Sequence, residues 1–223
     1  MPTAHRILTA LAGRRYLARD ERTRRFRLGP AALDLGERAR AVLDLRRVAL
    51  PVLRRLARET DETALLTVPN EARDHSVCLE RVESSQPLRL SVEPGRQLPL
   101  HAGASQKALL AFFDPDDIDL IASGRLERLC RATITNGDTL QADLAEIRAR
   151  GWAISFEETN VGVWGVAVPL LDAEGTAVAA VGLAGPSARL SQDEVLDHLE
   201  RLREATLATG TPLGLEVPEL TWP

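Results

Sequence analysis

The sequence predicts an α+β protein made of a small basic unit, a connecting helix and a larger unit that contains a β-sheet. Three observations support this class. Arginines crowd the first thirty residues, the spacing of apolar residues changes from a helical period to alternation after residue 62, and residues 162–186 form two almost continuous apolar runs. Alternation is typical of strands, and continuous apolar runs are typical of strands covered on both faces.

The composition is that of an ordinary globular protein, with 44% hydrophobic and 27% charged residues in a chain of 223. No apolar run approaches the roughly 18 residues that span a bilayer, and the N-terminus lacks the charged-then-apolar order of a signal peptide. We therefore expect a cytoplasmic protein. Cys78 and Cys130 are expected to be buried, unpaired thiols. The His75–Cys78 spacing does not suit a metal pair on a strand, so we expect neither a metal site nor a cofactor.

Charge is distributed unevenly along the chain. Residues 1–30 contain eight arginines and two acidic residues, a net charge of +6, whereas the remaining residues carry 20 basic and 30 acidic groups. A basic segment joined to an acidic body favours contact of that segment with phosphate. A merely solvated basic surface is the alternative.

The basic segment contains a helix pattern followed by a hairpin pattern. Residues 3–11 place Ile7, Leu8 and Leu11 on one face, and residues 16–19 and 25–28 suit two short strands. This order indicates the second half of a winged helix-turn-helix. The candidate DNA contacts are Thr3, His5 and Arg6 in the major groove, and Arg22, Arg24 and Arg25 at phosphates. Because only two residues precede Thr3, the earlier helices of such a module are missing and the apolar face lacks its cover.

Two amphipathic helices are expected next. The first follows Pro30 and is suited either to pairing with its own copy in a dimer or to packing on its own domain. Asp44 is expected to cap the second helix, which runs to residue 60 and should be kinked at Pro51.

The larger unit is predicted to alternate strands and helices. Strands are expected at residues 63–68, 75–82, 87–92 and 152–156 and in a hairpin at 162–186. Helices are expected between the small residues 102–105 and Phe113, from Pro115 onward, at 138–150 and at 192–207. Asp114, Gly151 and Ser191 supply the cap signals. Residues 210–223 are expected to form a loose tail.

Small residues suggest a space inside this unit. Ala102, Gly103, Ala104 and Ser105 precede a helix, and glycines at 162, 165 and 182 interrupt the apolar hairpin. Such residues allow either close packing or the approach of a ligand. Both interpretations remain open from these residues alone.

The order of the segments resembles the IclR family of bacterial transcriptional regulators over residues 2–208. The matching motifs are PTAHRILTAL, YLARD with FRLGP, LDLRRVALPVLRRLARETDET, LERVES, LPLHAGASQKALLAF, RARGWAISFEE, GVWGVAVPLLDAEG and VGLAGPSARLS. The resemblance implies a partial winged helix-turn-helix at 1–30, a linker helix at 31–47, an effector-binding domain at 48–209 and a C-terminal tail at 210–223. It implies a GAF-like curved antiparallel sheet flanked by helices. It also implies a homodimer or tetramer that binds a double-stranded DNA operator and responds to a small organic effector.

The resemblance also implies where an effector would bind. Family members that bind small carboxylates use an acidic residue, a cysteine and two serines, and the matching positions here are Ser155, Gly165, Gly182 and Ala184. The other matching wall residues are Leu90, Leu98, Ala104, Ser105, Val163 and Trp164. Since these positions are mostly apolar, we expect a small, mainly apolar or aromatic organic acid as effector.

Several alternatives stay open. The family's first two helices are absent, so either the start codon lies upstream, which we favour, or the chain is a remnant. A module that senses an effector and pairs with a full-length relative would not bind DNA itself. A serine–lysine hydrolase built on Ser105 and Lys107 is disfavoured, because residues two apart on a helix point about 200° from each other. We therefore expect no enzymatic activity, a solvated or helix-capping role for Lys107, and an ordinary hydrogen-bonded role for His101.

Overall fold

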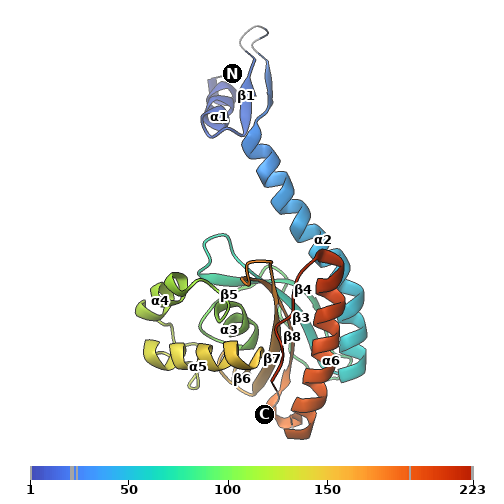
Figure 1. Cartoon of the computed structure of the whole chain (residues 1–223). Coiled ribbons are helices and arrows are strands. Elements are labelled where there is room, and N and C mark those ends of the chain that lie inside the picture. The colour runs from blue at the N-terminus through green and yellow to red at the C-terminus, as the bar shows by residue number, and fades with distance from the viewer. Residues whose placement is uncertain (1, 21–22, 24, 191, 222–223) are drawn as a thin grey trace. The chain divides into compact units, whose positions relative to one another are not determined.

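The computed structural model describes residues 2–20, 23, 25–190 and 192–221, and it leaves the side chains of residues 2–3, 34–43 and 192–193 undescribed. The chain divides into two compact units, Met1–Leu45 and Arg46–Pro223 (Figure 1). Among the described residues, no helix combines the length and the apolar character needed to cross a membrane.

The first unit has the predicted helix and hairpin. Helix α1 (Pro2–Gly13) precedes strands β1 (Leu17–Arg19) and β2 (Phe26–Leu28), which pair antiparallel with Ala18 opposite Arg27. Ile7 and Leu11 on the apolar face of α1 are 54% and 37% exposed, and Leu28 on β2 is exposed as well. The expectation of an uncovered apolar face is therefore confirmed for these side chains.

A single helix, α2 (Pro30–Thr60), replaces the two helices expected from the sequence. Asp44 lies inside this helix and does not begin a new one, so the prediction of a cap there is wrong. No glycine or proline interrupts residues 37–50, and the chain therefore has no reason to leave the helix at Asp44. Pro51 is accommodated within the helix, whose Leu53 and Leu56 are fully buried.

The second unit is built on a six-stranded antiparallel sheet with the order β5-β4-β3-β8-β7-β6. Its strands are β3 (Thr63–Pro69), β4 (His75–Val82), β5 (Gln97–Pro99), β6 (Ala153–Phe156), β7 (Val163–Leu171) and β8 (Ala177–Pro186). The sheet curls around the short helix α3 (Ala104–Leu110), and helices flank it, as the α+β fold class predicts (Figure 1). The apolar hairpin predicted at 162–186 supplies two neighbouring inner strands, β7 and β8.

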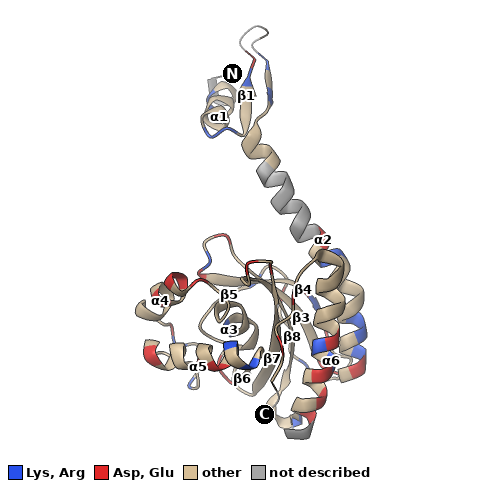
Figure 2. Ribbon diagram, viewed as in Figure 1, with Lys and Arg blue, Asp and Glu red and all other residues tan. Residues whose placement is uncertain are grey.

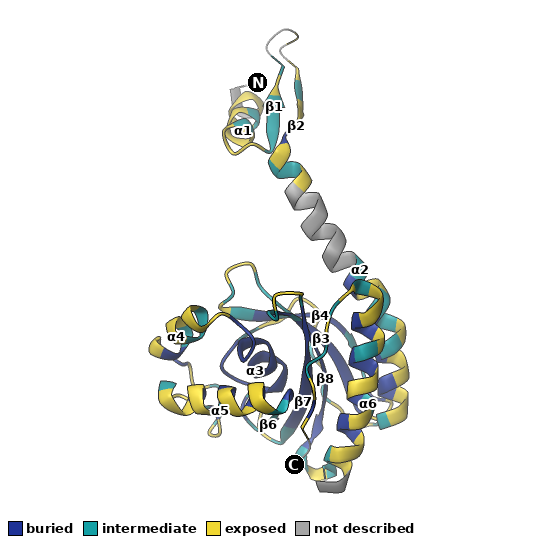
Figure 3. Cartoon of the chain, viewed as in Figure 1, coloured by how far each residue is buried: buried dark blue, intermediate teal, exposed yellow. Residues whose placement is uncertain are grey.

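Helices cover both faces of the sheet. Helix α6 (Gln192–Gly210) packs against β7 and β8 on one face, and α3 packs against the same strands on the other. Every residue of α3 is buried (Figure 3). Helices α4 (Pro115–Ser123) and α5 (Gly137–Arg150) lie outside α3. Helix α5 buries Leu140, Leu144 and Ile147 in the same core as α3. The predicted caps at Asp114 and Gly151 are confirmed, whereas Ser191 lies outside the described residues.

Residues 83–96, which we call the strap, do not form the strand predicted at 87–92. At residues 88, 90 and 92 of the strap, side chains and not a neighbouring strand donate to the backbone carbonyls. Thr63, Arg81 and Arg189 donate hydrogen bonds to the carbonyl oxygens of Leu90, Val92 and Leu88. The edge of β4 pairs with residues 97–99 after the strap. Side-chain donors therefore take the place of a strand ladder, and alternation alone could not reveal this.

The C-terminal residues are not loose. Glu216 pairs with Leu171 of β7, the Trp152 indole N–H donates to the Thr221 carbonyl, and Leu220 is buried. The expectation of a loose tail is wrong for residues 211–221, because their backbone completes hydrogen bonds of the sheet edge and of the α5–β6 turn.

Candidate effector cavity

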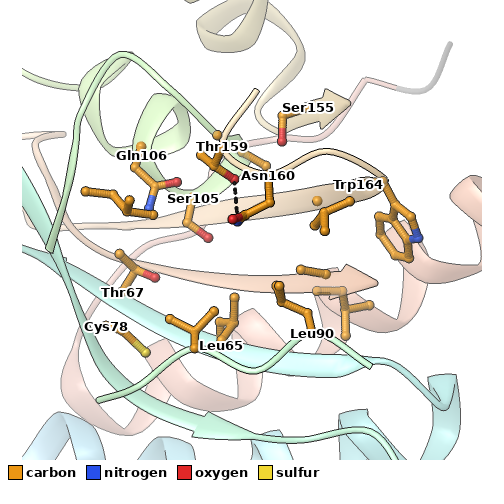
Figure 4. Close-up of a pocket in the computed structure, with 18 of the residues that line it drawn as sticks. Leu65, Thr67, Cys78, Leu90, Ser105, Gln106, Ser155, Thr159, Asn160 and Trp164 are labelled. Atoms are coloured by element: carbon orange, nitrogen blue, oxygen red, sulfur yellow. Dashed lines mark hydrogen bonds between the residues drawn. The ribbon is translucent and has the colours of Figure 1, made fainter. Parts of the chain in front are cut away.

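A cavity of about 150 Å³ lies between the start of α3, the sheet and the strap (Figure 4). Ser105, Ser155, Thr159 and Asn160 lie on one side of it, and Leu65, Thr67, Cys78 and Leu90 lie on the other. Strands β3, β4, β7 and β8, α3, the strap and the loop after β6 therefore all contribute to one space.

The structure gathers the predicted site residues around this cavity. Its lining includes Leu90, Leu98, Ala104, Ser105, Ser155, Val163, Trp164, Gly165 and Ala184. Gly182 is the exception. A Cβ atom on Gly182 would lie 2.7 Å from Ser105 Oγ and 3.1 Å from the Val166 carbonyl oxygen. Gly182 therefore allows α3 to pack closely on the sheet and does not line the space itself.

Gly165 and Ala184 keep the floor of the cavity low. They are register partners on β7 and β8. A Cβ on Gly165 would point toward Ser155 Oγ and the Ala104 Cβ, at 3.4 and 3.5 Å. Larger side chains at these two positions would fill the space between the sheet and α3.

Trp164 borders the cavity, but its indole belongs to the other face of the sheet. Successive side chains on a strand point to opposite faces, and its neighbour Gly165 faces the cavity. The indole stacks on the His198 imidazole of α6, with ring centroids 5.4 Å apart and an angle of 19° between the planes. The ring consequently lies at the margin of the group in Figure 4.

The lining is more polar than the sequence suggested. Thr67, Ser91, Gln106, Thr159 and Asn160 line the cavity in addition to the predicted serines. Apolar residues still make up more than half of the lining, and these polar groups join them, so the wall is mixed. Alternation along β3 could have placed Leu65 and Thr67 on one face, whereas no sequence signal placed Thr159 and Asn160 there.

Some polar lining groups are hydrogen-bonded, and others have no partner in the described part of the chain. Gln106 donates to Ser76 Oγ and Asn160 donates to Thr159 Oγ1, at 3.0 and 3.4 Å. The hydroxyls of Thr67, Ser105 and Ser155 make no side-chain hydrogen bond to described residues, and they are available to a ligand. The Arg96 side chain, which also lines the cavity, forms no ion pair with described residues.

The Cys78 thiol is a neutral part of the wall. Burial raises its pKa to about 11, and its Sγ lies 3.6 Å from the Glu80 carbonyl oxygen. Because the thiolate is the nucleophile, a thiol with this pKa is unreactive near neutral pH. Both cysteines are unpaired as expected, although Cys130 is only half-buried.

Lys107 is neither solvated nor a helix cap, contrary to expectation. It is 2% exposed, and its Nζ lies 2.6 Å from Glu158 Oε1 and 2.8 Å from Asp143 Oδ2. Its ammonium is engaged by two carboxylates, which opposes a catalytic partnership with Ser105. His101 is buried, and its Nε2 lies 2.9 Å from the Glu127 carbonyl oxygen, as expected for a hydrogen-bonded structural residue. The described residues contain no cluster suited to a metal ion.

The candidate DNA contacts are only partly described. His5, Arg6 and Arg25 are exposed on the first unit. Figure 2 shows arginine segments, in blue, in this unit. Thr3 belongs to α1, although its side chain is not described, and Arg22 and Arg24 lie outside the described residues.

Comparison with known proteins identifies the family. Residues 38–210 match the family described as bacterial transcriptional regulator IclR, C-terminal. The chain belongs to the IclR family. The HTH-type transcriptional regulator BhcR of Paracoccus denitrificans is 37% identical over 190 residues, which cover 85% of this chain and 67% of that protein.

Solved IclR structures share the fold. The Thermotoga maritima IclR matches with a TM-score of 0.73 and 25% identity, covering 96% of this chain and 85% of that one. An IclR homologue from Microbacterium hydrocarbonoxydans, solved in complex with 4-hydroxybenzoate, matches with a TM-score of 0.70 and 28% identity over 96% and 85% of the two chains. The relatives to which this chain is similar are thus named as transcriptional regulators and not as enzymes.

Proposed function

We propose that this IclR-family protein regulates transcription in response to a small organic acid that binds in the cavity beside α3. The observation that carries the proposal is a cavity lined by apolar side chains, by hydroxyls without a partner among the described residues, and by Arg96, which has no ion pair among them. A guanidinium suits a carboxylate, and hydroxyls suit the polar substituents of a small acid. The effector contacts are the lining residues named above.

The size of the cavity favours a small effector. A space of about 150 Å³ holds a benzene-sized molecule, whereas drug-sized ligands need roughly 300 Å³ or more. Leu65, Leu90 and Val163 offer apolar surface for a ring. An aromatic monocarboxylate therefore fits best, and the 4-hydroxybenzoate complex of a relative supports this class. Tight calorimetric binding of glyoxylate or pyruvate, without binding of aromatic acids, would overturn the aromatic preference.

The first unit is the proposed DNA contact. Its net charge of +6 favours phosphate, and His5, Arg6 and Arg25 are exposed on its helix and hairpin. Thr3, Arg22 and Arg24 complete the proposed contact set. We propose residues 1–30 as a partial winged helix-turn-helix, 31–47 as its linker and 48–209 as the effector domain of a homodimer or tetramer.

A mobility-shift assay tests the regulatory function. The intergenic DNA upstream of the gene is titrated with this chain, and with a chain extended by about 30–40 upstream codons, enough for the two further helices of a winged module. We expect the extended chain to bind, with affinity that falls as salt rises and that changes when 4-hydroxybenzoate is added. If neither chain shifts this DNA at low salt, the regulatory proposal fails.

A second candidate is a sensing module that pairs with a full-length relative. The exposed apolar side chains of Ile7 and Leu28 favour this alternative, since a partner would cover them. Binding of the 223-residue chain to effector but not to DNA, together with co-purification with a full-length relative, would support it.

A further inference from the structure

Lys107 is the only lysine of the chain, and it is buried behind the cavity. Its ammonium on α3 joins Asp143 on α5 to Glu158 in the loop after β6. We propose that Lys107 and Glu158 form a positioning pair that holds together two adjacent segments on the polar side of the effector cavity, residues 103–105 at the start of α3 and residues 158–160 after β6, which we call the two polar walls. The inference rests on the proposed effector role of that cavity.

Glu158 connects both walls through its carboxylate. Oε1 accepts from the Lys107 ammonium at 2.6 Å, and Oε2 accepts from the Gly103 backbone N–H at 2.9 Å. The backbone carbonyl of Glu158 also accepts from Thr133 Oγ1 at 2.7 Å. The loop after β6 is thereby fixed to the residue that immediately precedes α3.

The residues next to these contacts line the cavity. Thr159 and Asn160 follow Glu158, and Ala104 and Ser105 follow Gly103. The two walls touch closely, because a Cβ on Gly103 would lie 3.0 Å from Thr159 Cγ2, and the positive φ of Gly103, 97°, already favours glycine. Displacing the Glu158 carboxylate would therefore change the positions of both walls.

Burial makes this pair an unusual choice for stability alone. Glu158 is 8% exposed and Lys107 is 2% exposed, so both charges have lost most of their hydration. Buried ion pairs add little net stability over apolar packing of the same volume, but they fix geometry through directed hydrogen bonds. Fixed geometry is what a cavity of this small size requires.

The test uses the double variant Lys107→Met/Glu158→Gln, which removes both buried charges and keeps an acceptor for the Gly103 N–H. Asp143→Asn is the matched variant that leaves the Lys107–Glu158 contact in place. Arg46→Gln controls for loss of an ion pair elsewhere, since Arg46 pairs with Glu80. Calorimetric titration with 4-hydroxybenzoate and glyoxylate is combined with hydrogen exchange of residues 98–106 and 157–162 without ligand.

We expect the double variant to bind the preferred acid about tenfold more weakly, as for the loss of one or two hydrogen bonds. Exchange should rise in both segments, while Asp143→Asn and Arg46→Gln stay close to wild type in both measurements. If the double variant does not unfold cooperatively, Glu158→Gln alone is measured in the same way. Here we expect faster exchange of residues 98–106 and 157–162 and weaker binding.

Two outcomes separate this inference from the proposed function. Wild-type exchange in both segments of the variant, or wild-type affinity in it, overturns the positioning role. Failure of the wild-type chain to bind either acid, with exchange still raised in the variant, counts against the effector proposal and leaves the coupling of the two walls supported.

Discussion

Arg96 is the one charged residue that lines the cavity in the described part of the chain, and it has no ion-pair partner there. We predict that Arg96→Gln weakens binding of 4-hydroxybenzoate by about tenfold, the lower part of the range for a hydrogen bond to a charged group, because Arg96 is exposed. Titration calorimetry measures this, with Arg203→Gln on α6 as the control. Equal affinities for the two variants would remove Arg96 from the site.

Cys78 provides a chemical probe of the same space. Burial raises its pKa to about 11, two units above the ordinary value of 9.0, so its thiolate is about a hundredfold scarcer than that of a free thiol near neutral pH. In Cys130→Ser, we predict labelling by a thiol reagent about a hundredfold slower than that of a free cysteine. Added 4-hydroxybenzoate should slow the labelling of Cys78 further. Labelling at the rate of a free thiol would contradict the buried position.

At the scale of elements, the strap depends on Arg189. This side chain donates to both carboxylate oxygens of buried Glu62 and to the Leu88 carbonyl. Arg189→Gln leaves Glu62 buried without its cation, and we predict a loss of about 2–3 kcal/mol in the free energy of unfolding. The double variant with Glu62→Gln should lose less, about 1 kcal/mol.

Urea unfolding followed by tryptophan fluorescence measures both variants. A single variant that unfolds at the wild-type urea concentration would mean that the ion pair does not hold the strap.

Elements with local signals could be predicted from the sequence. Asp114 followed by Pro115 fixed the start of α4, and Gly151 marked the end of α5, because caps act within one turn of a helix. The absence of a helix breaker at residues 37–50 was likewise a local signal for the continuity of α2. The irregular strap could not be predicted. The strap depends on donors from Thr63 and Arg189, which lie 27 and 101 residues from their acceptors.

The small residues of the site could be predicted from the sequence, whereas the buried ion pairs of Lys107 could not. Small residues at 102–105 and Gly165 indicated an open space from their sequence alone. The role of Lys107 was hidden because its partners Asp143 and Glu158 lie 36 and 51 residues away. Only the folded chain brings these charges together, and a lysine on a helix is ordinarily solvated.

At the scale of the whole molecule, His198 makes stability depend on pH. Burial lowers its pKa below the usual 6.5, outweighing the opposite effects of Asp197 and Glu194, while Arg201 lowers it further; the Trp164 ring covers one face. The unfolded state therefore binds the proton more readily than the folded state, and stability falls as the pH drops below about 6.5.

We predict that His198→Phe removes part of this loss between pH 7 and pH 5, while keeping an aromatic ring against Trp164. Urea unfolding of both proteins across this interval gives the two slopes. Carboxylates whose pKa is lowered, such as Asp197 and Glu83, become protonated below this pH interval and do not affect the difference between the two slopes. Equal slopes for the two proteins would show that His198 does not titrate as a buried group.

The two units differ in charge and in structure. The first has the arginine-rich helix and hairpin, and the second has the buried sheet and the cavity. Regulation by an effector requires that the effector bind differently to two states of the whole protein. The cavity is therefore the feature on which the account depends.

Calorimetric titration of 4-hydroxybenzoate into the wild-type chain and into Ala184→Leu tests this feature most directly. Ala184 lines the cavity opposite Gly165, and leucine there would occupy a large part of the 150 Å³. We predict saturable binding of one molecule per chain to the wild type and no measurable binding to a variant that still unfolds cooperatively. Equal binding by both proteins, or no binding of any small organic acid to the wild type, would contradict the account.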